Sequence, residues 1–240
     1  MTAVYVVGAG IALVVLVLAA LLFIGARRNQ ARSPVAIVIL RRTSRPITEV
    51  QIRDYARRLL GMEGEIPVMP MPGPDDKGQA MIIGVPQDNY MFGVVSCTAP
   101  YLGEDERADF VKQCEHPGTR AAFAEHQAWV SIEVFGKPAA AKTPAGRMAL
   151  YTKMAPVIAE LMDDESLLLL LPADNKLAKP DAAAAEALRQ GNVSAVFDQM
   201  EEDYGAPIVR VGSDNSAVER AVATAQKRLP EFLGAWAERG

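Results

Sequence analysis

Hydrophobic residues follow three patterns along this chain, and each pattern predicts a different kind of element. Residues 4–26 form one uncharged apolar run without a polar face. Residues 35–40 and 166–171 form short continuous apolar runs, which are typical of strands buried on both faces of a sheet. Elsewhere apolar residues recur at helical spacing, as at Ile52, Tyr55 or Ala56, Leu59 and Leu60. The chain therefore predicts one long apolar helix followed by strands and amphipathic helices.

Capping and turn residues set the expected boundaries of these elements. One helix begins at Thr48, and another begins after Thr143 and continues towards Asp164 with a kink at Pro156. Residues 62–78 hold four prolines and predict an irregular connection. The other expected strands are residues 80–85, 90–96, 128–135 and 207–211, and the other expected helices are residues 104–115, 118–127, 181–190, 194–202 and one that begins at the capping box of Ser216 and Glu219.

These elements predict an α+β fold with a mixed sheet of about five strands and helices packed on it. Residues 1–26 form the expected transmembrane anchor, residues 27–34 a basic linker and residues 35–212 the α+β domain. Residues 213–240 form a C-terminal helix, which is either the start of a truncated second domain or a terminal element of the first.

The apolar run at residues 4–26 fits a membrane span better than its two alternatives. Its 23 residues give roughly 34 Å of helix, enough to cross a hydrocarbon core of about 30 Å. A core helix would have a polar face, and a signal peptide would have basic residues before the run and a small-x-small cleavage site. We therefore expect an uncleaved single span, with the lipid bilayer as its partner.

Charges on either side of the span predict its orientation. No charged side chain precedes it, and no acidic residue interrupts the six arginines that follow, Arg27, Arg28, Arg32, Arg41, Arg42 and Arg45. The positive-inside rule therefore places the body in the cytoplasm, at the inner membrane, with the N-terminus outside. The chain carries a net charge of −4, so residues 46–240 carry −10. Such an acidic body argues against nucleic acid as a partner.

Nucleophilic catalysis has few candidate residues in this chain. A thiol mechanism would pair Cys97 or Cys114 with His126 as base, and with Glu125 or Glu133 as the orienting carboxylate. Nothing in the sequence places these side chains together, and Cys97 ends an apolar strand, where an inert core thiol is ordinary. We therefore assign no catalytic residue and keep Cys97, Cys114, His126 and Glu133 as candidates.

Cofactors and metals are not expected from the motifs. The spacing of Cys97, Cys114, His116 and His126 matches no common structural zinc pattern. Glycine loops that bind phosphates are absent, which removes the usual sequence sign of a nucleotide. The acidic residues 163–165 are interpreted as a solvated helix end.

Two stretches of sequence resemble known families. Residues 124–135 (AEHQAWVSIEVF), the helix before Asp163 and residues 166–172 (SLLLLLP) resemble a bacterial family of uncharacterised α+β domains, the domain of unknown function of the 4261 type. That resemblance covers residues 35–175 and implies an α+β fold without a known activity. Residues 221–236 (AVATAQKRLPEFLGAW) resemble the opening helix of the uncharacterised 2314-type domain.

The sequence therefore predicts a single-pass membrane protein that presents an acidic cytoplasmic α+β domain. We expect this domain to be a binding or scaffolding module for an unknown protein partner. The alternative is a membrane-tethered thiol-dependent hydrolase or another enzyme, and a third possibility is a structural remnant without a ligand.

Overall fold

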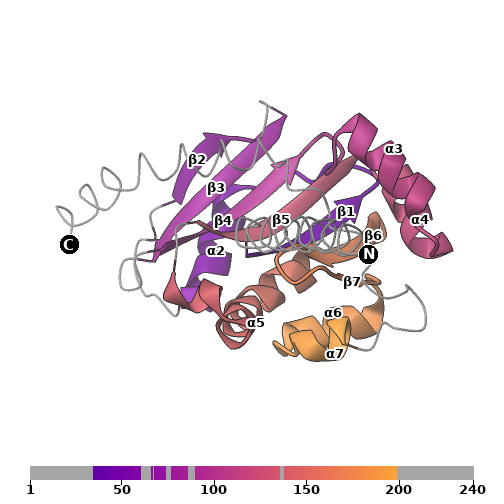
Figure 1. Ribbon diagram of the computed structural model, residues 1–240. Coiled ribbons are helices and arrows are strands. Elements are labelled where there is room, and N and C mark those ends of the chain that lie inside the picture. Colours follow the sequence, from indigo (N-terminus) through magenta and orange to yellow (C-terminus); the bar gives the residue numbers. More distant parts are fainter. Residues whose placement is uncertain are drawn as a thin grey trace, which may run out of the picture. The chain divides into compact units, whose positions relative to one another are not determined.

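The computed structural model describes residues 35–60, 66, 68–73, 77–85, 90–135 and 138–198. These residues form a seven-stranded sheet in the order β2-β3-β4-β5-β1-β6-β7 (Figure 1). The α+β class is confirmed, but the predicted mixed sheet of five strands is wrong, because all seven strands pair antiparallel. The strands are β1 (Ala36–Arg41), β2 (Val68–Pro72), β3 (Gly78–Val85), β4 (Tyr90–Cys97), β5 (Ala128–Phe135), β6 (Ser166–Leu171) and β7 (Lys176–Ala178).

The described helices begin where the capping residues predict them. The Thr48 hydroxyl accepts a hydrogen bond from the Gln51 N–H at 3.3 Å, and the Thr143 hydroxyl accepts one from the Gly146 N–H at 3.1 Å. These bonds satisfy backbone donors that the first helical turn leaves free. The helices are α2 (Glu49–Leu60), α3 (Glu104–Gln113), α4 (Pro117–Glu125), α5 (Pro144–Leu161), α6 (Ala182–Arg189) and α7 (Val193–Phe197), with a short 3₁₀ helix, η3 (Ala139–Lys142).

Helices pack on both faces of the sheet, so β1 and β5 are buried along their whole length. Alternate residues of a strand point to opposite faces. Ile37 and Ile39 of β1 belong to the first core, which also contains side chains of α2, α5, α6 and α7. Val38 and Leu40 belong to the second core, whose helical side chains come from α3 and α4. In Figure 1, α3 and α4 lie together at one end of the strands.

Two strands were missing from the sequence prediction, and both lie at the edges of the sheet. β2 lies within the proline-rich stretch that predicted an irregular connection, and it contains Pro70 and Pro72. Proline has no N–H to donate to a ladder, so it is tolerated on an edge strand, and among the described strands β2 pairs with β3 alone. β7 has three residues, and within the described part of the chain it pairs with β6 alone. β2 and β7 form because β3 and β6 offer backbone hydrogen bonds to them, and their own sequence patterns do not predict strands.

Several predicted elements lie outside the described residues. They are the membrane span at residues 4–26, the linker at residues 27–34, the strand at residues 207–211 and the helix that begins at Ser216. Among the helices that the structure describes, none is both long and apolar enough to cross a membrane.

Candidate functional site

The structure places both candidate thiols in the second core. Cys97 ends β4 and pairs in register with Trp129 of β5. Cys114 follows α3, where its Sγ donates to the carbonyl oxygen of His116 at 3.6 Å. Both thiols are buried. This environment is the ordinary one for a small inert core residue.

His126 lies close to this core but is fully engaged with the backbone. Its Nε2 accepts a hydrogen bond from the Tyr101 N–H at 2.9 Å, and its Nδ1 lies 2.8 Å from the carbonyl oxygen of Phe123. The two contacts together require the neutral ring with the proton on Nδ1. Burial lowers the pKa of His126 to about 4. Neither ring nitrogen is left to take a proton from a thiol.

We call the face of the sheet that carries the first core the first face, and the face that carries the second core the second face. Glu133 lies in the middle of β5 on the second face, and only 2 % of its surface is exposed. The Ser131 hydroxyl donates to its Oε1 at 2.6 Å, while its Oε2 is buried without a partner among the described residues. Burial raises the pKa of Glu133 to about 7, against the opposing effect of the Ser131 hydrogen bond. The other candidate carboxylate, Glu125, lies at the surface, 3.5 Å from Arg42. Neither carboxylate orients His126.

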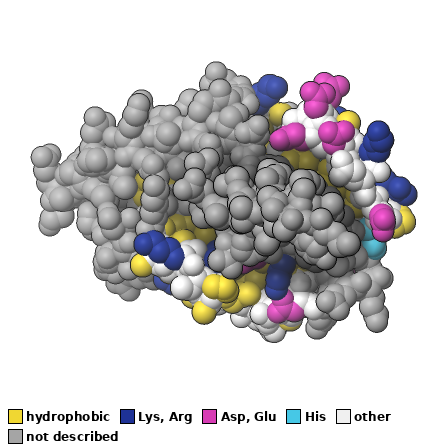
Figure 2. Space-filling view, in the orientation of Figure 1, with side chains coloured by type: hydrophobic (Ala, Val, Ile, Leu, Met, Phe, Trp, Pro, Cys, Tyr) yellow, Lys and Arg dark blue, Asp and Glu magenta, His cyan; other side chains and the backbone are white. Residues whose placement is uncertain are grey.

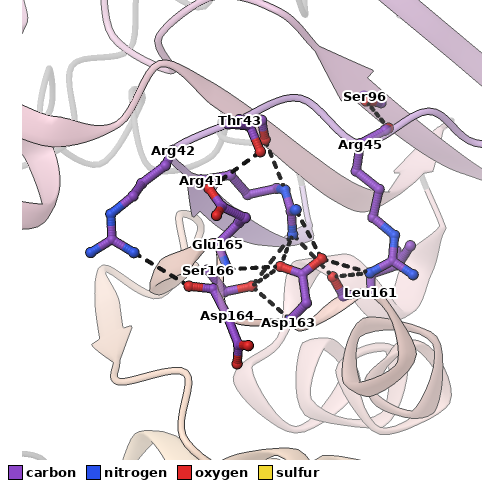
Figure 3. A network of polar contacts seen from close by, with 10 residues as sticks. All are labelled: Arg41, Arg42, Thr43, Arg45, Ser96, Leu161, Asp163, Asp164, Glu165 and Ser166. Atoms are coloured by element: carbon purple, nitrogen blue, oxygen red, sulfur yellow. Dashed lines mark hydrogen bonds and ion pairs between the residues drawn. The ribbon is translucent and has the colours of Figure 1, made fainter.

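A polar network joins the end of β1 to the turn between α5 and β6 (Figure 3). Arg41 has a side chain that is only 3 % exposed, and it holds Asp163 with two hydrogen bonds of 2.8 and 2.9 Å. Arg45 binds the same carboxylate at 3.2 Å and also donates to the carbonyl oxygen of Leu161. Burial opposes ionisation of Asp163, but Arg41, the Glu165 N–H and Arg45 together lower its pKa.

This network adds to two interpretations of the sequence. Arg41, Arg42 and Arg45 are among the six arginines counted for the orientation of the span, and all three bind acidic side chains of the described domain. Asp163 and Asp164 lie exposed just after the end of α5, as expected for a solvated helix end, and Asp163 in addition anchors the buried Arg41. Arg41 and Asp163 are 122 residues apart in the chain, and they meet because β1 is the neighbour of β6, the strand that follows Asp163.

A groove of about 190 Å³ lies on the first face of the sheet, between α2 and α5. We call it the α2–α5 groove, and it is lined by Tyr55, Arg58, Thr152, Lys153, Pro156, Val157 and Glu160. The guanidinium of Arg58 lies 5.5 Å from the centre of the Tyr55 ring and makes a two-pronged ion pair with Glu160. Burial and the nearby Glu160 raise the pKa of Tyr55, so its hydroxyl stays protonated at neutral pH.

The α5 side of this groove has two features that favour binding over a purely structural role. Pro156 lies inside α5 and has no N–H, so the carbonyl of Thr152 loses its helical donor. Lys153 is exposed and, among the described residues, forms no ion pair. The groove thus combines an apolar floor with an amine that is free to pair with a ligand.

Only part of the α2–α5 groove could be predicted from the sequence. Pro156 in a helical pattern predicted an irregularity of α5, and Tyr55 was placed on the apolar side of α2. Nothing local could place Arg58 and Glu160 together, because they are separated by 102 residues.

Neither surface charge nor the arrangement of metal-ligating residues points to a further binding site among the described residues. Figure 2 shows acidic side chains gathered over α3, whose first turn contains Glu104, Asp105 and Glu106. Carboxylates there complement the positive end of the helix dipole. Within the described ranges, no group of three histidine, cysteine, aspartate or glutamate residues is arranged to hold a metal ion.

Comparison of the chain with protein-family models, with curated proteins and with solved structures finds no match. The resemblance of residues 35–175 to the 4261-type domain therefore stays a prediction. The function has to be argued from the site alone.

Proposed function

We propose that this protein is a single-pass membrane protein whose α+β domain binds a partner protein through the α2–α5 groove. The observation that carries the proposal is the combination of the apolar Tyr55 and Val157 in the groove lining with the exposed amine of Lys153, which forms no ion pair with any described residue. A partner fits this arrangement with one apolar side chain in the groove and an acidic group beside it.

The size of the groove supports a protein partner over a small-molecule substrate. Its volume of about 190 Å³ is below the roughly 300–1,000 Å³ of typical small-molecule pockets. One side chain that inserts into such a cavity is the usual anchor of a protein interface. The engagement of His126 by Tyr101 and Phe123 supports the same choice over a thiol hydrolase.

Membrane attachment rests on the sequence of the N-terminal region. Residues 4–26 have the length and composition of a span, and Arg27, Arg28 and Arg32 follow it. The eight residues from 27 to 34 reach on the order of 16 Å as a flexible coil. We therefore expect the α2–α5 groove to lie close to the inner leaflet.

Site-directed photocrosslinking tests the groove as the binding surface. A benzophenone amino acid introduced at Thr152 is expected to yield one discrete adduct in intact cells, whereas the same probe at Lys112 on α3 yields none. Lys153→Glu reverses the charge beside the groove and should abolish that adduct. Lys112→Glu makes the same change of charge on another helix and should leave it intact.

Two results would contradict the proposal. One is that both probe positions give the same adducts, which indicates nonspecific contact. The other is that Lys153→Glu leaves the Thr152 adduct unchanged, which shows that the partner does not use the groove.

A further inference from the structure

The second face of the sheet is apolar well beyond the region that α3 and α4 contact. Tyr101 packs against Trp129 at one end of the strands, where α4 leads into β5. Glu133 lies four residues further along β5, about 13 Å away at the rise of a strand. Its cross-strand neighbours on this face are Ala36 of β1 and Gly93 of β4, followed by Ile82 of β3 and Met69 of β2.

We call this row of five residues the Glu133 row. Ala36, Ile82 and Glu133 are buried, yet the described helical side chains of the second core all belong to α3 and α4. Apolar side chains such as Ala36 and Ile82 are unfavourable in contact with water unless something packs over them. The Phe135 ring of β5 lies over Gly93, but Phe135 is itself only 1 % exposed, so Phe135 and the Glu133 row together need an occupant beyond the described residues.

We propose that residues 216–236 of the same chain form an amphipathic helix that packs over the Glu133 row. Apolar residues recur in this segment at helical spacing, at Val218, Val222, Ala225, Leu229, Phe232 and Trp236. The opposite side of the same helix carries Arg220 and Lys227. One apolar stripe and one charged side are what a helix on the outside of a sheet needs.

The length of the segment matches the surface to be covered. Residues 216–229 form a helix of about 21 Å. The Glu133 row crosses five strands, which span about 19 Å. Pro230 need not end the helix there, because α5 continues through Pro156.

The chain can also reach this face from the last described helix. α7 ends at Phe197, and the following Asp198 forms an ion pair with Lys176 of β7, which is an edge strand. Residues 199–215 would span roughly 20–25 Å as a flexible coil. Layers pack about 10 Å apart and β1 lies two strands in from β7, so the path around the β7 edge to Ala36 is about 30 Å, well within the roughly 56 Å that 17 extended residues can span.

The N-terminal apolar run is the competing occupant, and its composition fits less well. Residues 4–26 are apolar on every side. Packed on the sheet, such a helix would expose its outer side to water, whereas a bilayer covers all of it. This inference is independent of the α2–α5 groove, which lies on the first face.

Thiol labelling of the full-length protein in membranes tests the proposal. A cysteine introduced by A36C reports access to the Glu133 row, and N-ethylmaleimide crosses membranes, so the result does not depend on topology. Val222→Asp combined with Leu229→Asp should speed labelling of A36C at least about tenfold by detaching the helix. Lys227→Asp, on the charged side of the helix, should leave the rate within about twofold. Unchanged cooperative thermal unfolding shows that each variant is folded.

A crosslinking measurement gives the positive evidence. A short bismaleimide should join the thiols of A36C and V222C and should not join those of A36C and K227C. The proposal is overturned if A36C stays protected in the double aspartate variant. It is also overturned if only removal of residues 4–26 exposes A36C, which would make the N-terminal run the occupant, or if A36C reacts rapidly in the unmodified chain.

Discussion

At the scale of single residues, Glu133 is the most unusual feature of the structure. It lies in the interior of an antiparallel sheet, with Ser131 as its hydrogen-bond partner and one oxygen unpaired among the described residues. A buried carboxyl in such a place is held neutral, because burial penalises the charged form. Its protonation state is therefore linked to the stability of the fold.

We predict that Glu133 makes the protein less stable as the pH rises through neutrality. The pKa of Glu133 is raised from 4.5 to about 7, so the unfolded chain releases this proton first and stability falls between these two values. The free energy of unfolding of Glu133→Gln, relative to wild type, should rise by about 3 kcal/mol from pH 5 to pH 8. Urea unfolding of the detergent-solubilised protein at both pH values measures this difference.

Glu125→Gln is the matched control for this prediction, since Glu125 lies at the surface. Its difference from wild type should be the same at both pH values. An equally flat difference for Glu133→Gln would show that the Glu133 carboxyl is not held neutral in the folded protein.

His126 should have the opposite effect on the acid side. Its pKa is lowered from 6.5 to about 4 by burial, so the unfolded chain binds the proton first and stability falls as the pH drops from 6.5 to 4. The stability of His126→Gln should depend less on pH in this window than that of wild type. Urea midpoints at pH 4.5 and 6.5 test this, and an unchanged dependence would indicate that His126 is charged in the fold.

At the scale of elements, the packing between β4 and β5 depends on a glycine. Gly93 lies opposite Glu133, and a Cβ there would stand 2.1 Å from a ring carbon of Phe135 and 2.8 Å from Ile82. Gly93→Ala should therefore destabilise the fold by about 1–3 kcal/mol, because neither side chain can move freely in the core. Gly103→Ala has only a flexible Glu106 oxygen nearby, at 3.7 Å, and should change stability by less than about 1 kcal/mol. Thermal unfolding of both variants tests the contrast, and equal effects would refute it.

The ion-pair network at the end of β1 should stabilise the junction between β1 and the turn before β6. Asp163→Asn removes the charge that neutralises the buried Arg41, with an expected loss of about 2 kcal/mol. Asp164→Asn, one residue away, should change stability by less than about 0.5 kcal/mol, because only its main-chain oxygen accepts a bond, from Arg42. Urea unfolding at pH 7 measures both. The network has no such role if the two variants are equally stable.

At the scale of the whole molecule, membrane attachment should depend on residues 4–26 alone. Without this run, we expect the protein to move from the carbonate-washed membrane pellet to the supernatant, because the described helices include none that could replace the span. The full chain should stay in the pellet. A deleted variant that remains in the washed pellet would show that another part of the chain binds the bilayer.

The topology prediction is tested by labelling at Glu186, which is exposed on α6. Cys97 and Cys114 are buried, so a thiol introduced by E186C is the expected site of reaction. A membrane-impermeant maleimide should label E186C only after the cells are permeabilised. Labelling of intact cells would place the body outside.

The sequence by itself determined the local elements of this protein. Thr48 and Thr143 place helix starts correctly, and the apolar runs place β1 and β6, because capping and side-chain periodicity act over a few neighbouring residues. The prediction of an irregular connection at residues 62–78 was wrong for residues 68–72 for the same reason. These residues form β2 because they pair with β3, and this pairing is not a local property of the sequence.

The tertiary structure alone decided which distant residues meet. It placed β1 between β5 and β6, joined Arg41 to Asp163 and brought Arg58 to Glu160 at the α2–α5 groove. It also left Glu133 in an apolar row, where burial raises its pKa to about 7. These features depend on the order of the strands in the sheet and on the packing of helices against it. The charges and apolar residues within one element do not determine that order.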